Sequence, residues 1–260
     1  MRIQLGRQSV GQKKMCDKLI HRGPDQQGVY LDKGISLGHT RLSILDLSEK
    51  GRQPMTDKEG GIAIVFNGEI YNYRELKEEY LGEFDFKSKT DTEVLIYMYK
   101  KFGKGLLKYI NGRFAFCIYD RKRKIFFLAR DRLGMNPLYY YWNKEKFLFA
   151  SELKAIVEDD GIIRKVDMNA VYHYLQYGYT PQEESILEGI KKLPPAHFME
   201  FDLKREEIKI ERYWELDFSE KIHISEKEAI KRIRQLMSES VKKKAYCRCS
   251  CRSFFIRRNG

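Results

Sequence analysis

Cysteine thiols have the widest choice of chemistry in this sequence, since a thiolate can attack a carbonyl, bind a metal or form a disulfide. The chain has five, an odd number in 260 residues, which does not indicate a disulfide framework. Cys16 lies in an expected helix and Cys117 in an expected apolar strand, so both are predicted to be structural. Cys247, Cys249 and Cys251 are separated by single residues, whereas paired zinc ligands usually stand at least about two residues apart. We therefore expect no metal site.

Polar residues that could bind a small ligand gather in four stretches: LIHRGPD (19–25), GHTRLSILDLS (38–48), FNGEIYNY (66–73) and KTDTEV (89–94). Taken one at a time, they have ordinary structural interpretations. Arg41 suits a solvated strand end, and Asn67-Gly68 suits a type I′ hairpin turn. Asp91 suits the first turn of a helix, where a carboxylate complements the helix dipole. None of the four stretches predicts a site alone.

Short strands and helices must position these stretches. Up to about residue 150 the sequence predicts strands in GVYL, ISLGHTRLSI, GIAIVFNGEI, RFAFCIYD, KIFFLARD, NPLYYYW and KFLFASE. Several are apolar almost throughout, as expected for strands covered on both faces. Helices are predicted at residues 11–20, 73–81 and 91–103. This pattern is typical of an α+β layered domain.

After residue 160 the sequence no longer predicts mainly short strands. A helix is predicted at 166–179, a proline-marked turn and a strand at 191–203, and a linker at 206–224. Residues 225–244 have an amphipathic helical pattern, with Ser225 as the N-cap and Glu228 three residues later. A lone helix of this length needs a surface to pack against. We therefore expect it to be the first helix of a truncated second domain.

The net charge of +12 would suit a nucleic-acid-binding protein if the basic groups were clustered on a folded surface. Residues 1–14 carry four basic groups and residues 242–260 carry seven, neither with an acid, so the rest of the chain carries only +1. Nucleic-acid binding is therefore disfavoured. No apolar run approaches the roughly 20 residues of a membrane span, and MRIQLGRQSV has no apolar signal-peptide core, so a cytoplasmic location is expected.

Together with ARDRLGMNPLYY (129–140) and FASELKAI (149–156), the four stretches resemble, in order and spacing, the class II glutamine amidotransferase domain of asparagine synthetases. The resemblance covers residues 10–244. It implies an N-terminal-nucleophile (Ntn) hydrolase-like four-layer αββα sandwich over residues 10–205. It also implies asparagine synthase (glutamine-hydrolysing) as the parent activity. In that reaction, ammonia from glutamine passes to a second domain and attacks ATP-activated aspartate.

The resemblance also implies a set of site residues. Asn67, through its side-chain amide, and Gly68, through its backbone N–H, would bind the oxyanion formed during amide hydrolysis. Arg41 would pair with the α-carboxylate of glutamine. Asp91 and Glu69 would hold the α-ammonium group. No cofactor is implied for this half, whereas ATP, Mg²⁺ and aspartate are implied for the parent enzyme, and a homodimer is left open.

The sequence departs from the family at both ends. The family begins at a cysteine whose own α-amine serves as the base, but here Met1 is followed by Arg2. Cys16 is a poor substitute because its amine is in a peptide bond. His21 and Arg22 are expected to hold the turn after the first helix. We therefore predict that this chain is inactive as a glutaminase.

The C-terminal end also lacks the family's S-G-G-x-D-S loop for ATP phosphates. Read shifted by one nucleotide with free codon choice, residues 245–260 permit LIADVPVGVSLSGGMD, the expected strand and loop. The same shift over residues 2–7 permits YNWDG, so we expect aberrant, frameshifted ends at 1–9 and 245–260. The alternatives are an inactive glutamine-binding or partner-binding fragment, or the amidotransferase half of another glutamine-dependent enzyme.

Overall fold

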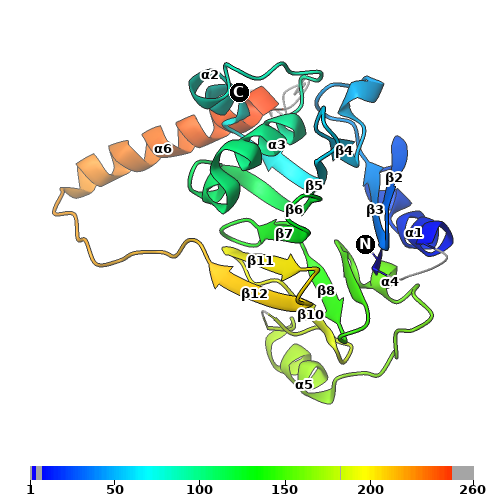
Figure 1. Ribbon diagram of the computed structural model, residues 1–260. Helices are drawn as coiled ribbons and strands as arrows, with labels where there is room; N and C mark the ends of the chain where they lie inside the picture. Colours follow the sequence, from blue (N-terminus) through cyan, green and yellow to red (C-terminus); the bar gives the residue numbers. More distant parts are fainter. Residues whose placement is uncertain (1, 4–7, 182, 248–260) are drawn as a thin grey trace, which may run out of the picture.

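The structure is a computed structural model that describes residues 2–3, 8–181 and 183–247, with side chains over 11–181 and 183–244. Two six-stranded antiparallel sheets lie face to face (Figure 1). The first has the order β10-β8-β9-β1-β3-β2 and the second β12-β11-β7-β6-β5-β4. The strands of the first sheet are β1 (Arg2–Ile3), β2 (Gln26–Asp32), β3 (Ile35–Arg41), β8 (Tyr139–Trp142), β9 (Phe147–Ala150) and β10 (Ile190–Lys192). Those of the second are β4 (Met55–Thr56), β5 (Ile62–Ile70), β6 (Gly112–Asp120), β7 (Ile125–Arg130), β11 (His197–Asp202) and β12 (Glu207–Arg212).

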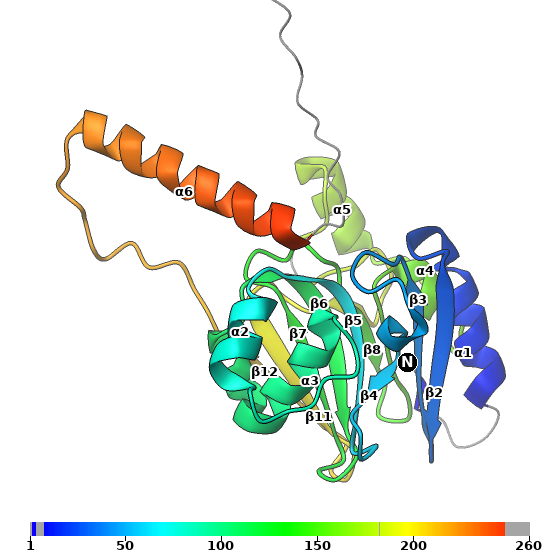
Figure 2. The same cartoon turned by 90° about the horizontal axis from the view of Figure 1, so that it is seen from above.

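Helices cover the outer face of each sheet (Figures 1 and 2). On the second sheet lie α2 (Tyr73–Tyr80), α3 (Asp91–Phe102) and the 3₁₀ segment η3 (Gly103–Lys108). On the first sheet lie α1 (Gln8–Asp17) and α4 (Leu153–Ile156). The remaining helices of the described residues are η1 (Ile20–Arg22), η2 (Glu49–Gly51), α5 (Met168–Tyr177) and α6 (Glu226–Cys247).

Strand alternation explains why the sheets stack. Successive side chains of a strand point to opposite faces. In β5, Ile62, Ile64 and Phe66 join the cluster under α2 and α3. Ala63 and Val65 join the cluster between the two sheets. With a third cluster under α1 and α4, these contacts make four layers in the order helix, sheet, sheet, helix.

The central strands are buried on both faces, as their apolar sequences predict. In β6 all residues from 114 to 120 are buried, and in β7 all residues from 126 to 129 are buried. Cys117 is fully buried in β6, so its prediction as a packing residue is confirmed. All seven strands predicted before residue 152 have a counterpart in the two sheets, and the predicted α+β sandwich is confirmed.

The start of α3 is fixed by a side-chain cap. The Thr90 hydroxyl accepts a hydrogen bond from the N–H of Glu93 at 3.3 Å, and Gly103 ends the helix at a positive φ of 54°. This cap determines where the first residue of the helix, Asp91, lies. The predicted helix at 91–103 therefore has the expected ends.

The predicted linker at 206–224 is partly wrong. Residues 207–212 form β12, which pairs with β11 in the register His197↔Arg212 to Asp202↔Glu207. Its burial is low because it is the edge strand of its sheet, which is why its sequence lacks an apolar run. The short strands β4 and β10 were not predicted either, since two or three residues carry no periodic signal.

The last helix stands apart from the two sheets. The segment before it is extended, and α6 lies clear of the sandwich for most of its length (Figures 1 and 2). The hydroxyl of Ser225 accepts a hydrogen bond from the N–H of Glu228 at 3.3 Å, so the predicted N-cap is confirmed. On the apolar face of α6, Ile233 and Met237 are 59% and 63% exposed. This face, called here the apolar stripe, is therefore not covered by any other part of the described residues.

The structure describes only parts of the two basic ends of the chain, residues 1–14 and 242–260. Arg2 and Ile3 form β1, which pairs with β3 and, through Arg2, with β9. α1 begins at Gln8, earlier than the predicted residue 11, and α6 continues to Cys247, beyond the predicted residue 244. Residues 1, 4–7 and 248–260, on which much of the frameshift hypothesis rests, lie outside the described residues.

Candidate functional site

A cavity of about 330 Å³ lies where β3, β5, α1 and the start of α3 meet. Cavities of about this size and larger are typical of small-molecule sites. Its lining includes all five residues proposed for ligand binding, namely Arg41, Asn67, Gly68, Glu69 and Asp91. They come from three elements: the end of β3, the second half of β5 and the first turn of α3. The fold thus gathers around one cavity residues that lie far apart in the sequence.

The guanidinium of Arg41 is anchored by the loop that follows it. Nη2 donates to the carbonyl oxygens of Leu45 and Asp46, both at 2.7 Å. Nη1 donates to Oε1 of Gln26 at 2.8 Å. Arg41 is only 5% exposed, so the interpretation as a solvated strand-end arginine is wrong. These contacts hold the fork in one orientation at the cavity wall.

Gly51 makes room for this guanidinium. A Cβ atom at Gly51 would lie 2.2 Å from Nη2 of Arg41, closer than atoms can approach. The loop and the arginine are therefore matched to each other.

Asn67 and Gly68 lie inside β5, so the hairpin interpretation of Asn67-Gly68 is wrong. Gly68 has a φ of 152°, and a Cβ atom there would lie 2.1 Å from the carbonyl oxygen of Arg113. Only glycine fits this backbone. The side-chain Nδ2 of Asn67 is buried and has no hydrogen-bond partner among the described residues. A buried donor of this kind costs stability unless something accepts its hydrogen bond.

Beyond its short pairing with β4, the side of β5 that faces away from β6 carries backbone N–H donors. The N–H of Phe66 donates to Oε1 of Gln53 at 2.7 Å, and the N–H of Ile70 donates to Oδ2 of Asp91 at 2.9 Å. N–H groups of residues i and i+2 point to the same side of a strand. The N–H of Gly68 therefore points to the side occupied by Gln53 and Asp91, where the cavity lies.

Two buried carboxylates supply negative charge to the same cavity. Oε1 of Glu69 pairs with Nη2 of Arg113 at 3.0 Å. Asp91 is only 5% exposed, and burial raises its pKa to about 7, against the hydrogen bonds it accepts from backbone N–H groups. The charge of Glu69 raises the pKa of Asp91 further. A cation bound beside Asp91 would relieve both effects.

His39 contributes a neutral ring to the wall. Its Nε2 lies 3.0 Å from the carbonyl oxygen of Phe66, so this nitrogen carries the proton and donates. Nδ1 is then an acceptor, and it is buried with no partner within the described ranges. Burial lowers the pKa of His39 to about 4, which keeps the ring uncharged at neutral pH.

The two thiols of the cavity lining are poor nucleophiles. Cys16 lies in α1, as predicted, and Cys117 in β6, and both are buried. Burial raises the pKa of Cys16 and of Cys117, so the reactive thiolate is disfavoured at both positions. Neither has the low pKa of an activated cysteine.

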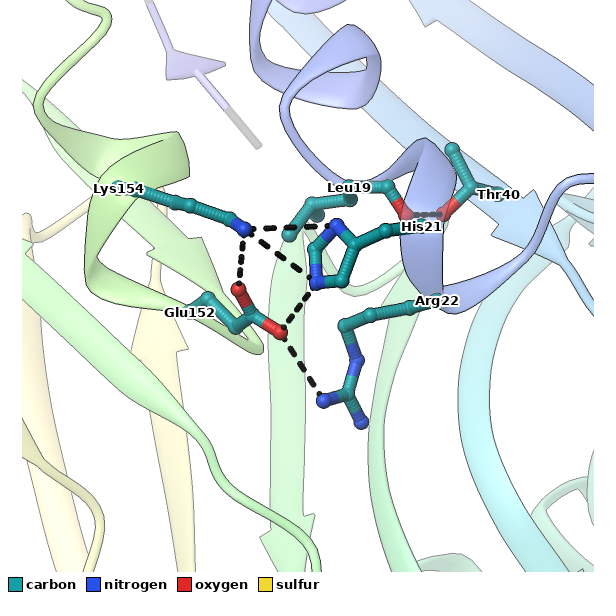
Figure 3. Close-up of polar contacts among 6 residues, drawn as sticks. All are labelled: Leu19, His21, Arg22, Thr40, Glu152 and Lys154. Carbon is teal, nitrogen blue, oxygen red and sulfur yellow. Dashed lines mark hydrogen bonds and ion pairs between the residues drawn. The ribbon is translucent and has the colours of Figure 1, made fainter.

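An ionic cluster beside the cavity ties η1 to α4 (Figure 3). Oε1 of Glu152 lies 3.0 Å from both Nε2 of His21 and Nη1 of Arg22, and Oε2 lies 3.1 Å from Nζ of Lys154. Hydrogen bonds from these three groups hold the pKa of Glu152 below its usual range, although burial alone would raise it. His21 and Arg22 thus hold the turn after α1, as predicted.

The cavity residues that were not singled out from the sequence as site residues include His39, Gln53 and Asn136. His39 and Asn136 lie inside the GHTRLSILDLS and ARDRLGMNPLYY stretches. Their position within these motifs was the one sequence feature that could have marked them as site residues. Gln53 lies outside every recognised stretch. In the part of the chain that the structure describes, no three His, Cys, Asp or Glu side chains gather as metal ligands. No helix in that part is long and apolar enough to cross a bilayer.

The sequence of the chain matches that of a known family of domains. The family model described as "Glutamine amidotransferase domain" matches residues 4–214, which is most of the chain. The chain therefore belongs to this family of enzymes.

Two curated relatives illustrate the similarity. The putative asparagine synthetase [glutamine-hydrolyzing] 2 of Methanocaldococcus jannaschii is 40% identical over 262 residues, covering 92% of this chain and 50% of the relative. Asparagine synthetase [glutamine-hydrolyzing] 3 of Bacillus subtilis is 36% identical, covering 92% of this chain and 39% of the relative. The chain thus spans half or less of the length of these relatives.

A solved structure has a related fold. The glutamine phosphoribosylpyrophosphate amidotransferase from B. subtilis, complexed with ADP and GMP, superposes with a TM-score of 0.50 at 20% identity. The match covers 71% of this chain and 36% of that one. At this identity the likeness concerns the fold alone.

Proposed function

We propose that the cavity binds L-glutamine and that it is the glutamine site of an asparagine synthase. The observation that carries the proposal is the convergence on a single cavity of Arg41, two carboxylates and an amide donor that has no partner among the described residues. Arg41 pairs with the α-carboxylate, while Asp91 and Glu69 hold the α-ammonium group. These opposite charges complement the two ends of a zwitterionic amino acid.

The side-chain amide of glutamine then extends toward Asn67 and Gly68. Nδ2 of Asn67 and the N–H of Gly68 are donors suited to a carbonyl oxygen, and to the negative charge that the oxygen gains on attack. The names of the curated relatives support the larger activity, in which ammonia from glutamine is used to make asparagine. ATP, Mg²⁺ and aspartate belong to that activity and would bind outside the cavity described here.

This chain is proposed to bind glutamine without hydrolysing it. The thiols that line the cavity, Cys16 and Cys117, have raised pKa values, so the thiolate that would attack the amide is disfavoured at both positions. Removing the covalent nucleophile of an amidase leaves only the small effects of binding and oxyanion stabilisation. Ammonia release that disappears in a Cys16→Ala variant would overturn this proposal.

Isothermal titration calorimetry tests the binding itself. L-Glutamine should bind to the wild-type protein, and Asp91→Asn should weaken it about 10- to 100-fold, the value of one charge-assisted contact. Asp160→Asn, which removes an exposed carboxylate, is the matched control and should leave the affinity unchanged. Equal affinity of the wild type and Asp91→Asn would contradict the assignment.

A further inference from the structure

We propose that Asn136 is a positioning residue that orients and polarises the peptide group between Asn67 and Gly68. The side-chain Nδ2 of Asn136 donates to the carbonyl oxygen of Asn67 at 2.6 Å. Asn136 is only 7% exposed, so this hydrogen bond is shielded from water. The inference rests on the proposed function, in which the N–H of the same peptide group binds the glutamine side chain.

The loop between β7 and β8 is built to present Asn136. The carboxylate of Asp131 accepts hydrogen bonds from the N–H groups of Leu133, Met135 and Asn136 at 3.0–3.1 Å. It also accepts from the N–H of Phe114 in β6 at 3.2 Å, which ties the loop to the strand beside β5.

Arg130 closes the loop from the other side. Its Nε donates to the carbonyl oxygen of Asn136 at 2.8 Å, and its Nη2 donates to that of Gly134 at 2.7 Å. With its backbone held at both the N–H and the C=O, Asn136 has little freedom to turn away from Asn67.

Peptide geometry carries the effect to Gly68. The C=O of residue 67 and the N–H of residue 68 belong to one planar trans peptide group and point in opposite directions. Fixing the carbonyl on the β6 side therefore fixes the N–H on the cavity side, between the N–H groups of Phe66 and Ile70. Hydrogen bonds in a chain also polarise one another, strengthening each by about 10–30%. A donor on the carbonyl makes the Gly68 N–H a better donor to a ligand.

The experiment compares two substitutions at one position. Asn136→Leu keeps nearly the same shape but has no donor, whereas Asn136→His keeps a donor nitrogen at a similar distance from the backbone. Asn169→Leu, on the exposed face of α5, is the matched control. The readouts are the ¹H–¹⁵N resonance of Gly68 in the unliganded protein and the Kd for L-glutamine.

Asn136→Leu should shift the Gly68 amide proton upfield and raise the Kd about threefold, the scale of one weakened neutral hydrogen bond. Asn136→His should restore both readouts toward wild type, and Asn169→Leu should change neither. If Asn136→Leu fails to fold, Asn136→Ala, which also has no donor and adds no charge, gives the same comparison. A wild-type Gly68 resonance in the donor-less variant would overturn the inference. A wild-type protein that binds no glutamine would instead overturn the proposed function, with the Gly68 shift still testing the polarisation.

Discussion

Asp91, the first residue of α3, accepts a hydrogen bond from the backbone N–H of Ile70 at 2.9 Å, across a sequence separation of 21 residues. This bond joins the end of β5 to the start of the helix that covers it. It also places a buried carboxylate beside Gly68 and Glu69 at the cavity wall. The ligand-binding properties of the cavity depend on this junction, because it fixes charge and donors relative to each other.

Glutamine binding should weaken as the pH falls below about 7. Burial raises the pKa of Asp91 to about 7, so this carboxyl is protonated at lower pH and cannot pair with the α-ammonium group. Binding selects the ionised form, so the apparent Kd should rise about fivefold between pH 7 and pH 6 and level off above pH 8. Calorimetry across this range measures the effect. Asp91→Asn should flatten the profile, and a wild-type Kd that is constant from pH 6 to pH 8 would contradict the assignment.

Gly68→Ala should destabilise the protein and abolish glutamine binding. The new methyl group would lie 2.1 Å from the carbonyl oxygen of Arg113, at a φ of 152° that alanine rarely adopts. We expect a loss of at least about 1–3 kcal/mol in the free energy of unfolding, measured in urea. Gly82→Ala is the control, since its Cβ atom would meet nothing within 4 Å. Similar unfolding midpoints for the two variants would show that β5 does not need glycine here.

Arg41→Lys should lower both stability and affinity despite keeping the charge. A lysine ammonium cannot reproduce the fork that reaches the carbonyl oxygens of Leu45 and Asp46 together with Gln26. We expect a loss of about 1–2 kcal/mol in the free energy of unfolding and at least about tenfold in affinity. Arg52→Lys, at a half-exposed arginine, should cost little in either measurement. Unchanged glutamine affinity in Arg41→Lys would remove Arg41 from the site.

The amides of α6 should exchange with solvent much faster than those of β6. The apolar side chains of α6, including Ile233 and Met237, are largely exposed, whereas β6 is buried on both faces. Helices without a packed face are marginal in water. Hydrogen exchange followed by mass spectrometry measures the contrast. Protection of α6 equal to that of β6 would mean that another surface covers the apolar stripe in solution.

Local patterns predicted the layers of the fold because the apolar strands and the capped helices carry periodic signals. The β6 and β7 sequences predicted burial on both faces, and KTDTEV predicted the start of α3. β12 was missed although Ile208 and Ile210 alternate with charged residues, because the strand is short and its pairing with β11 at the edge of the sheet is a tertiary contact.

The candidate site was predicted only where the resemblance named residues. Taken alone, Asn67-Gly68 predicted a hairpin turn, and this was wrong because the same dipeptide can also lie inside a strand. Asn136 lies 69 residues from the carbonyl it contacts, and Gln53 lies 13 residues from the N–H that it accepts from. Such contacts depend on tertiary packing, which a single sequence does not display.

A crystal structure of the protein with L-glutamine tests the central claim most directly. The amide should remain intact because no activated thiol lines the described cavity. The account predicts the α-carboxylate at Arg41, the α-ammonium group between Asp91 and Glu69, and the side-chain carbonyl oxygen within about 3 Å of Asn67 Nδ2 and the Gly68 N–H. Glutamine bound elsewhere, or an empty cavity at saturating concentration, would contradict it.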